Sequence, residues 1–270
     1  MKEFFGFGGY MREPEGYLSW QHLVFVTSLM IIMVAFAVWL GKIYRNADAK
    51  QKNLPLIVAA IMIDCFELFK IVVMCIRGKD ALGWLYELPL FLCSIQLITI
   101  PLAAFAKGRV KEAALDFVFI FGILSAVLGT YAAGNNYSCY PVLSFDNVIS
   151  GITHSISGFS SLYIAISGMS SMKRKNIPIT FAILLSFCVA ATIANITLDY
   201  NYMFLVRPDG TPYEIVYSIA GGNAVIYPIL VVLLFVIYIV AFHFIYNYFK
   251  GRKVKADKNL KEDKIFISVQ

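Results

Sequence analysis

Charged residues are scarce in this sequence. Asp, Glu, Lys and Arg make up 15% of the 270 residues, whereas about a quarter of a typical soluble domain is charged. Apolar residues reach 59%, and runs of the ~20 residues needed to cross a bilayer recur along almost the whole chain. This pattern excludes a separate soluble domain and predicts an all-α, polytopic membrane protein with one membrane domain.

The sequence also lacks the common signs of metal and cofactor chemistry. Its five cysteines form no CxxC pair and its three histidines lie far apart, so neither a disulfide framework nor a metal site is indicated. The P-loop, the nucleophile elbow, the zinc-protease motif and internal repeats of 20 to 50 residues are missing as well. We therefore expect no metal and no cofactor.

Seven apolar segments are predicted to be membrane helices. They cover residues 17–40, 54–76, 82–106, 113–131, 148–169, 177–198 and 219–249. Together they form a membrane domain over residues 17–249. Residues 1–16, rich in Phe and Gly, are typical of an interfacial segment, and the charged tail 250–270 is predicted to be disordered.

Positive charge is unevenly distributed between the connections. Seventeen of the 23 Lys and Arg residues lie in one set of connections and the tail, and five lie in the other set. Because cytoplasmic loops carry the basic excess, we predict an outside amino terminus, a cytoplasmic carboxyl terminus and a place in the cell membrane. The net charge of +6 then reflects topology, and no basic, aromatic-interleaved domain indicates a nucleic-acid partner.

Three charged side chains fall inside the second predicted helix. Asp64, Glu67 and Lys70 each cost about 2.5 to 3.5 kcal/mol at membrane depth and so need partners or a wet cavity. Their spacing of three keeps them on one face of a helix. We predict an interior Glu67–Lys70 pair, which either holds helices together or handles a substrate or proton.

The stretch 87–101, ELPLFLCSIQLITIP, carries the most unusual chemistry. Pro89 and Pro101 predict a membrane helix that is broken or bent at both ends. Between them, Cys93 and Gln96 are three residues apart and so share a face of a helix. That face carries a potential nucleophile and a hydrogen-bonding group.

Counting residues along the predicted helices places four reactive side chains at similar depth. Cys93, His154, Tyr227 and Glu67 all fall in the predicted outer half of the membrane, with Asn195 near the mouth of a shared cavity. A thiol becomes a nucleophile when a nearby imidazole takes its proton. We therefore predict a Cys93–His154 dyad; the alternatives are a small core cysteine and a packing histidine within the small-residue run 151–158.

At these residues the chain resembles a known family over residues 20–248. The matching motifs are LPLFLCS at 88–94, THS at 153–155, Asn195, NYMFL at 201–205 and YP at 227–228. They look like the YwaF-type bacterial seven-helix proteins, which are grouped with the eukaryotic transmembrane protein 164 acyltransferases. The resemblance implies that Cys93 accepts an acyl chain from a glycerophospholipid and that His154 is its base. Bacterial relatives usually carry histidine at the position of Phe91.

These observations predict a membrane acyltransferase that works through a Cys93 thioester. Its expected partners are phospholipid, lysophospholipid and the bilayer. The predicted substrate-binding residues are Glu67, Gln96, Asn195, Asn201, Tyr202 and Tyr227. The alternatives are a hydrolase that gives the acyl group to water, and a transporter or lipid receptor that uses the charges of the second helix.

Overall fold

The regular secondary structure of the described residues is helical. The computed structural model describes the backbone of residues 1–268 and the side chains of residues 1–250. The long helices are α1 (Trp20–Tyr44), α2 (Ala49–Gly78), α4 (Gly108–Tyr131), α6 (Phe145–Ser167), α7 (Ile177–Leu198) and α9 (Ile226–Ser268). The short ones are α3 (Gln96–Phe105), α5 (Gly134–Cys139), α8 (Glu214–Ile219) and the 3-10 helices η1 (Gly83–Glu87), η2 (Arg174–Asn176) and η3 (Tyr202–Phe204). The described residues form no strand, so the all-α prediction is confirmed.

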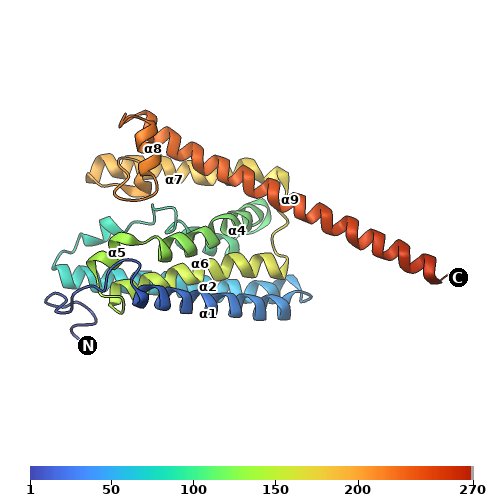
Figure 1. Ribbon diagram of the computed structural model, residues 1–270, viewed down its shortest axis with the longest axis horizontal. Coiled ribbons are helices and arrows are strands. Elements are labelled where there is room, and N and C mark those ends of the chain that lie inside the picture. Colours follow the sequence, from blue (N-terminus) through green and yellow to red (C-terminus); the bar gives the residue numbers. More distant parts are fainter. Residues whose placement is uncertain (269–270) are drawn as a thin grey trace.

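Helix α4 lies at the centre of the bundle. Helices α1, α2 and α6 lie on one side of it, and α7 and α9 lie on the other (Figure 1). In the apolar stretch that begins with α4, 72% of the residues are buried. In α1 and in the stretches that contain α7 and α9, only 22 to 28% of the residues are buried. The peripheral helices therefore leave broad apolar faces for lipid, as expected of a membrane protein.

Four described segments are long and apolar enough to cross a bilayer. They are Trp20–Tyr44, Gly108–Cys139, Arg174–Leu198 and Ile226–Lys250. Helices α2 and α6, with 30 and 23 residues, have sufficient length for a crossing, but their polar residues make them less apolar. The count of seven crossings and the sides on which the termini lie remain predictions.

The predicted helix over residues 82–106 is wrong in its first half, although the break predicted at Pro89 is present. The segment contains η1, a turn over residues 88–95 and then α3, which has only ten residues. Pro89 forces Leu88 into an extended conformation, with φ −59° and ψ 146°, and so ends η1. Pro101 lies inside α3, which continues to Phe105. At ~1.5 Å per residue, α3 covers only about half of the hydrocarbon thickness.

The last predicted helix also begins later than expected. Gly221 and Gly222 adopt positive φ of 60° and 71°, a conformation that glycine accepts readily, and they turn the chain between α8 and α9. Helix α9 runs to Ser268. The side chains after Lys250 lie outside the described residues, and the disorder of the tail stays a prediction.

Small residues allow α1, α4 and α6 to approach closely. A Cβ atom added at Gly158 of α6 would lie 2.2 Å from Met33 Sδ of α1 and 2.6 Å from Ala126 Cβ of α4. The prediction that the run 151–158 lets neighbouring helices come close is confirmed at this position. Serines of α6 donate to carbonyl groups four residues earlier, which satisfies their hydroxyls inside the bundle.

The two ends of the bundle differ in composition. At one end the basic connections meet: Arg109 donates to the carbonyl of Lys175 (3.3 Å), and Lys111 Nζ donates to Asn53 Oδ1 (2.7 Å). At the other end, residues 1–16 pack over α2 and α6, and the N–H of Phe145 donates to the carbonyl of Phe4 (2.9 Å). The connections predicted to share one side of the membrane are thus at the same end.

Candidate functional site

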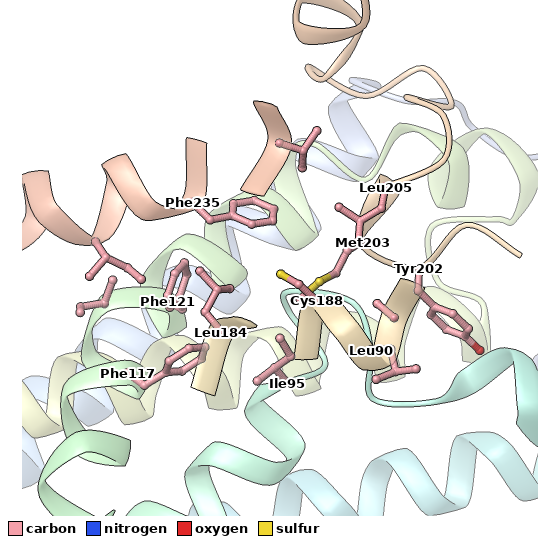
Figure 2. Packing of buried hydrophobic residues seen from close by; sticks show 14 of the residues in the cluster. Leu90, Ile95, Phe117, Phe121, Leu184, Cys188, Tyr202, Met203, Leu205 and Phe235 are labelled. Carbon is pink, nitrogen blue, oxygen red and sulfur yellow. The ribbon is translucent and has the colours of Figure 1, made fainter. Parts of the chain in front are cut away.

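Cys93 lies in the turn that precedes α3 and is half-buried. The residues around it anchor this turn: Leu90 is 9% exposed and Ile95 is fully buried. Both point into a hydrophobic cluster with Tyr202, Met203 and Leu205 (Figure 2). Leu90 and Ile95 therefore fix the turn in the core.

Local hydrogen bonds define the conformation of the turn. Ser94 Oγ accepts from the N–H of Phe91 (3.0 Å) and donates to its carbonyl (3.1 Å). The N–H of Gln96, the first residue of α3, donates to the carbonyl of Cys93 (3.3 Å). A position just before a helix N-terminus favours a thiolate.

His154 is half-buried on α6 and is oriented by α4. Its Nδ1 lies 3.2 Å from the hydroxyl of Ser125. Its ring lies directly against Gly129, where an added Cβ would be 2.0 Å from the imidazole Cε1. The two α4 residues are four apart, so they face α6 together and fix both the position and the hydrogen bonding of the ring.

Lys70 is the charged residue that influences both of these groups. Its Nζ lies 2.6 Å from Glu67 Oε1 and 2.9 Å from Glu87 Oε2, so the predicted Glu67–Lys70 pair is confirmed. The sequence prediction missed Glu87, because its pairing with Lys70 depends on how η1 packs against α2. The ammonium group acts electrostatically on both Cys93 and His154. The thiol and the imidazole thus lie in the region around one positive charge.

The predicted asparagines shape the chain after α7. Asn195 Nδ2 donates to the carbonyl of Tyr202 (3.1 Å), and its Oδ1 accepts from the N–H of Tyr202 (2.6 Å). Asn201 Nδ2 donates to Asp209 Oδ2 (2.8 Å), and its Oδ1 accepts from the N–H of Val206 (3.0 Å). Their observed role is structural, and their binding of substrate stays a prediction.

The two predicted tyrosines also donate to backbone carbonyls. Tyr202 donates to Leu85, and Tyr227 donates to Phe204 at 2.7 Å. Both rings are fully buried. These bonds attach the loop after α7 to η1 and to α9, and thereby close one side of the region around Cys93.

Gln96 differs from the other predicted substrate-binding residues because it retains a free donor. Its side chain is fully buried, and its Oε1 accepts from the hydroxyl of Thr99 (3.2 Å). Its Nε2 has no hydrogen-bond partner among the described residues. Because Gln96 begins α3 directly after the Cys93 turn, this amide is a candidate donor to a bound polar group.

Phe91 belongs to an aromatic wall beside the turn. Its ring centroid lies 5.2 Å from that of Tyr202, 5.7 Å from that of Phe204 and 6.3 Å from that of Tyr200. Tyr213, which interacts electrostatically with Cys93, packs on Phe204 at 5.8 Å. A mainly apolar wall of this kind suits an acyl chain better than a water-soluble substrate.

Sequence reasoning missed Ser125, Gly129 and Tyr213 besides Glu87. The spacing of a serine and a glycine one turn apart on α4 is the only local signal for the first two, and small residues are common in membrane helices. Among the described residues, no group of three or more His, Cys, Asp or Glu side chains is placed to hold a metal ion.

Comparison with known proteins supports the relationship suggested by the motifs. The family model described as the TMEM164 family matches residues 17–246, a range that includes every predicted site residue. No curated protein matches the chain, and no solved structure matches it.

Proposed function

Because the chain belongs to the TMEM164 family, we propose that it is a membrane acyltransferase that transfers a fatty acyl chain through a thioester on Cys93. The observation that carries this proposal is that Cys93 and His154 are both half-buried and both lie within the electrostatic reach of Lys70. The charge of Lys70 favours the thiolate and the neutral imidazole, which are the forms that the nucleophile and the base need. Burial is the larger influence on both groups, and it favours the neutral thiol as well as the neutral imidazole.

The proposed reaction has two halves. His154 takes the proton of the Cys93 thiol, and the sulfur attacks the ester carbonyl carbon of a phospholipid. The ester C–O bond breaks, a thioester remains on Cys93, and the lysophospholipid leaves with the proton from the imidazolium. In the second half, His154 takes a proton from the hydroxyl of a lysolipid, whose oxygen attacks the thioester and releases the thiol.

Other residues support this chemistry through position and polarity. When the ester carbonyl is attacked, its oxygen becomes negatively charged. The N–H groups at the start of α3 and the free Nε2 donor of Gln96 are candidates to stabilise this oxyanion. One such donor lowers the activation free energy by about 3 to 4 kcal/mol. The aromatic wall around Phe91 accommodates the acyl chain. The Ser125 hydroxyl orients the imidazole.

The transporter or receptor alternative has less support. It depends on charges of α2 that are available to a cargo, but the ammonium of Lys70 is paired with both Glu67 and Glu87. Asp64 forms no ion pair with a described residue, and it is half-buried rather than enclosed.

Trapping of the thioester tests the proposal. Full-length protein incubated with a phospholipid carrying a labelled acyl chain should acquire a hydroxylamine-sensitive label, and Cys93→Ser should abolish both the label and lysolipid acylation. His154→Ala should slow transfer by about 10² to 10⁴-fold, the usual contribution of a general base. Cys75→Ser, which changes another half-buried cysteine, is the matched control and should retain activity.

Each opposite result has a defined meaning. Undiminished transfer in Cys93→Ala overturns the covalent mechanism. Release of free fatty acid at the same rate with and without lysolipid shows that water is the acceptor, and the chain is then a hydrolase.

A further inference from the structure

A groove lies between α7 and α9, at the end of the bundle where the basic connections meet. It has a volume of about 400 Å³ and is lined by residues of both helices and by Arg174 of η2. Figure 1 shows α9 crossing α7 near this end and continuing past the other helices. Since α7 has 22 residues, its opposite end, near Tyr200 and the Cys93 turn, lies about 33 Å away at ~1.5 Å per residue.

The polar part of the groove is basic and has unused donors. His243 is 3% exposed, and neither of its ring nitrogens has a hydrogen-bond partner among the described residues. Arg174 is exposed and forms no ion pair with a described residue, whereas its neighbours Lys173 and Lys175 lie 2.9 Å and 4.0 Å from Glu112. An imidazole and a guanidinium thus remain available within one groove.

The dipole of helix α7 adds to this anion-binding character. Helix α7 begins at Ile177, which lines the groove. The N–H groups of Asn176 and Ile177 donate to the carbonyl groups of Lys173 and Arg174, and Pro178 has no N–H. The positive end of the helix dipole, rather than free N–H donors, therefore attracts an anion here. Asp116, which lies near His243, is fully engaged by Ser170 (2.6 Å) and by Asn176 (2.8 Å). The carboxylate oxygens of Asp116 are therefore already occupied by these two donors.

The apolar part of the groove is formed by Ile177, Val240 and Phe244, and Asn247 and Tyr248 complete its lining. A second groove of about 240 Å³, lined by Cys188 of α7 and Val232 of α9, lies farther along the same two helices. Cys188 follows Ile177 by eleven residues, or about three turns, so both face a similar direction about 16 Å apart. The distance suits an acyl chain that extends into the bilayer from a headgroup at Arg174.

We propose that this groove binds the phosphate of an anionic phospholipid, held by Arg174 and His243 beside the positive end of the α7 dipole, with an acyl chain along the groove between α7 and α9. The site is separate from the Cys93 region at the other end of α7. It does not depend on the acyl-transfer proposal. Charge-assisted hydrogen bonds from a guanidinium to a phosphate supply the recognition.

Lipid binding to the full-length protein in detergent, followed by native mass spectrometry, tests this proposal. The probe is phosphatidylglycerol, and diacylglycerol with the same chains is the comparison without a phosphate. Arg174→Gln and His243→Phe should each weaken phosphatidylglycerol binding about tenfold or more, the effect of one lost charge-assisted bond. The phenylalanine keeps an aromatic ring of similar size, which guards against loss of folding.

The control variants distinguish lipid binding in this groove from general electrostatic attraction of the lipid to the basic end of the protein. Lys175→Gln removes an adjacent exposed charge outside the groove and should leave binding within about twofold, since exposed charges contribute little. Cys93→Ser should bind as the wild type does, so failure of the acyltransferase proposal does not affect this result.

Four outcomes would overturn the proposal. They are unchanged binding in Arg174→Gln and His243→Phe, an equal loss in Lys175→Gln, equal binding of diacylglycerol, and displacement of the lipid by millimolar inorganic phosphate. The last of these would identify a site for the free ion.

Discussion

The imidazole of His154 can pack directly against α4 because residue 129 is a glycine and has no side chain. An alanine there would put its Cβ within 2.0 to 2.4 Å of three ring atoms, a distance that no pair of carbon atoms tolerates without movement. The ring must therefore shift or rotate away from Ser125. We expect Gly129→Ala to lower acyl transfer by about 10²-fold, the cost of roughly 1 Å of misplacement, while the protein still folds.

Gly134→Ala is the matched control for this change. Its added Cβ would meet the ring of Tyr17 at an ordinary contact distance of 3.7 Å, so transfer should be unchanged. Initial rates with labelled phospholipid measure both variants. Equal rates for Gly129→Ala and the wild type would show that the position of His154 does not matter to the reaction.

The effect of a substitution at Lys70 depends on the carboxylates that pair with it. One ammonium compensates the carboxylates of Glu67 and Glu87, and its side chain is 17% exposed. Removal of one partner from a buried pair costs about 3 to 5 kcal/mol, because the remaining charge is left unpaired. The three residues therefore respond unequally to substitution.

At the scale of elements, this cluster attaches α2 to η1, and Lys70→Met should destabilise the protein by about 3 to 5 kcal/mol. Glu67→Gln should cost less, because Glu87 still pairs with the ammonium. The triple change to Met, Gln and Gln should restore part of the loss. Thermal unfolding in detergent measures the series, and a larger loss in Glu67→Gln than in Lys70→Met would contradict the assignment of Lys70 as the centre.

Long apolar elements could be predicted from the sequence in full, whereas for the interrupted segment 82–106 only the break at Pro89 could be predicted. Helices α4 and α7 end at Tyr131 and Leu198, as the hydropathy pattern indicates, because a long apolar run has few other ways to satisfy its backbone in lipid. Residues 82–106 are equally apolar, but Pro89 restricts Leu88 and breaks the helix. Apolarity alone does not distinguish these two cases.

The residues of the candidate site also divide into those that could be predicted from the sequence and those that could not. Cys93, His154 and Lys70 could be selected by side-chain chemistry, because thiols, imidazoles and charges are few in this chain. Ser125 and Glu87 could not, since their importance comes from contacts between different elements. For Asn195, the sequence gives the polar group but not its partner, which is the backbone of Tyr202.

At the scale of the whole molecule, residues 1–16 close one end of the bundle through an ion pair. Arg77 Nη1 lies 2.7 Å from Asp146 Oδ2, and Tyr10 donates to the same carboxylate. Burial opposes ionisation of Asp146, but the bonds from Arg77 and Tyr10 prevail and lower its pKa. Burial and the bond to Asp146 raise the pKa of Tyr10 to about 12.

This arrangement predicts a dependence of stability on acid pH. Because the pKa of Asp146 is lower in the folded state, its stabilisation is complete above the unfolded value of about 3.9 and is lost as the pH falls through the folded value. Asp146→Asn should lower the unfolding temperature near pH 7, and the difference should shrink toward pH 3. Glu112→Gln, in an exposed pair with Lys173, is the control with a small effect. A constant difference across this pH range would contradict the role of Asp146.

The two ends of the molecule should face opposite sides of the membrane. The connections that contain Arg109, Lys111 and Lys175 meet at one end, while Cys139 is exposed on α5 at the other. Basic connections stay in the cytoplasm, so Cys139 should react with a membrane-impermeant thiol reagent in intact cells. A tag placed after Gln270 should stay protected until the cells are lysed. Cys139→Ser should abolish the labelling, because the other exposed cysteine, Cys65, lies within α2. Access to the tag without labelling of Cys139 would reverse the predicted orientation.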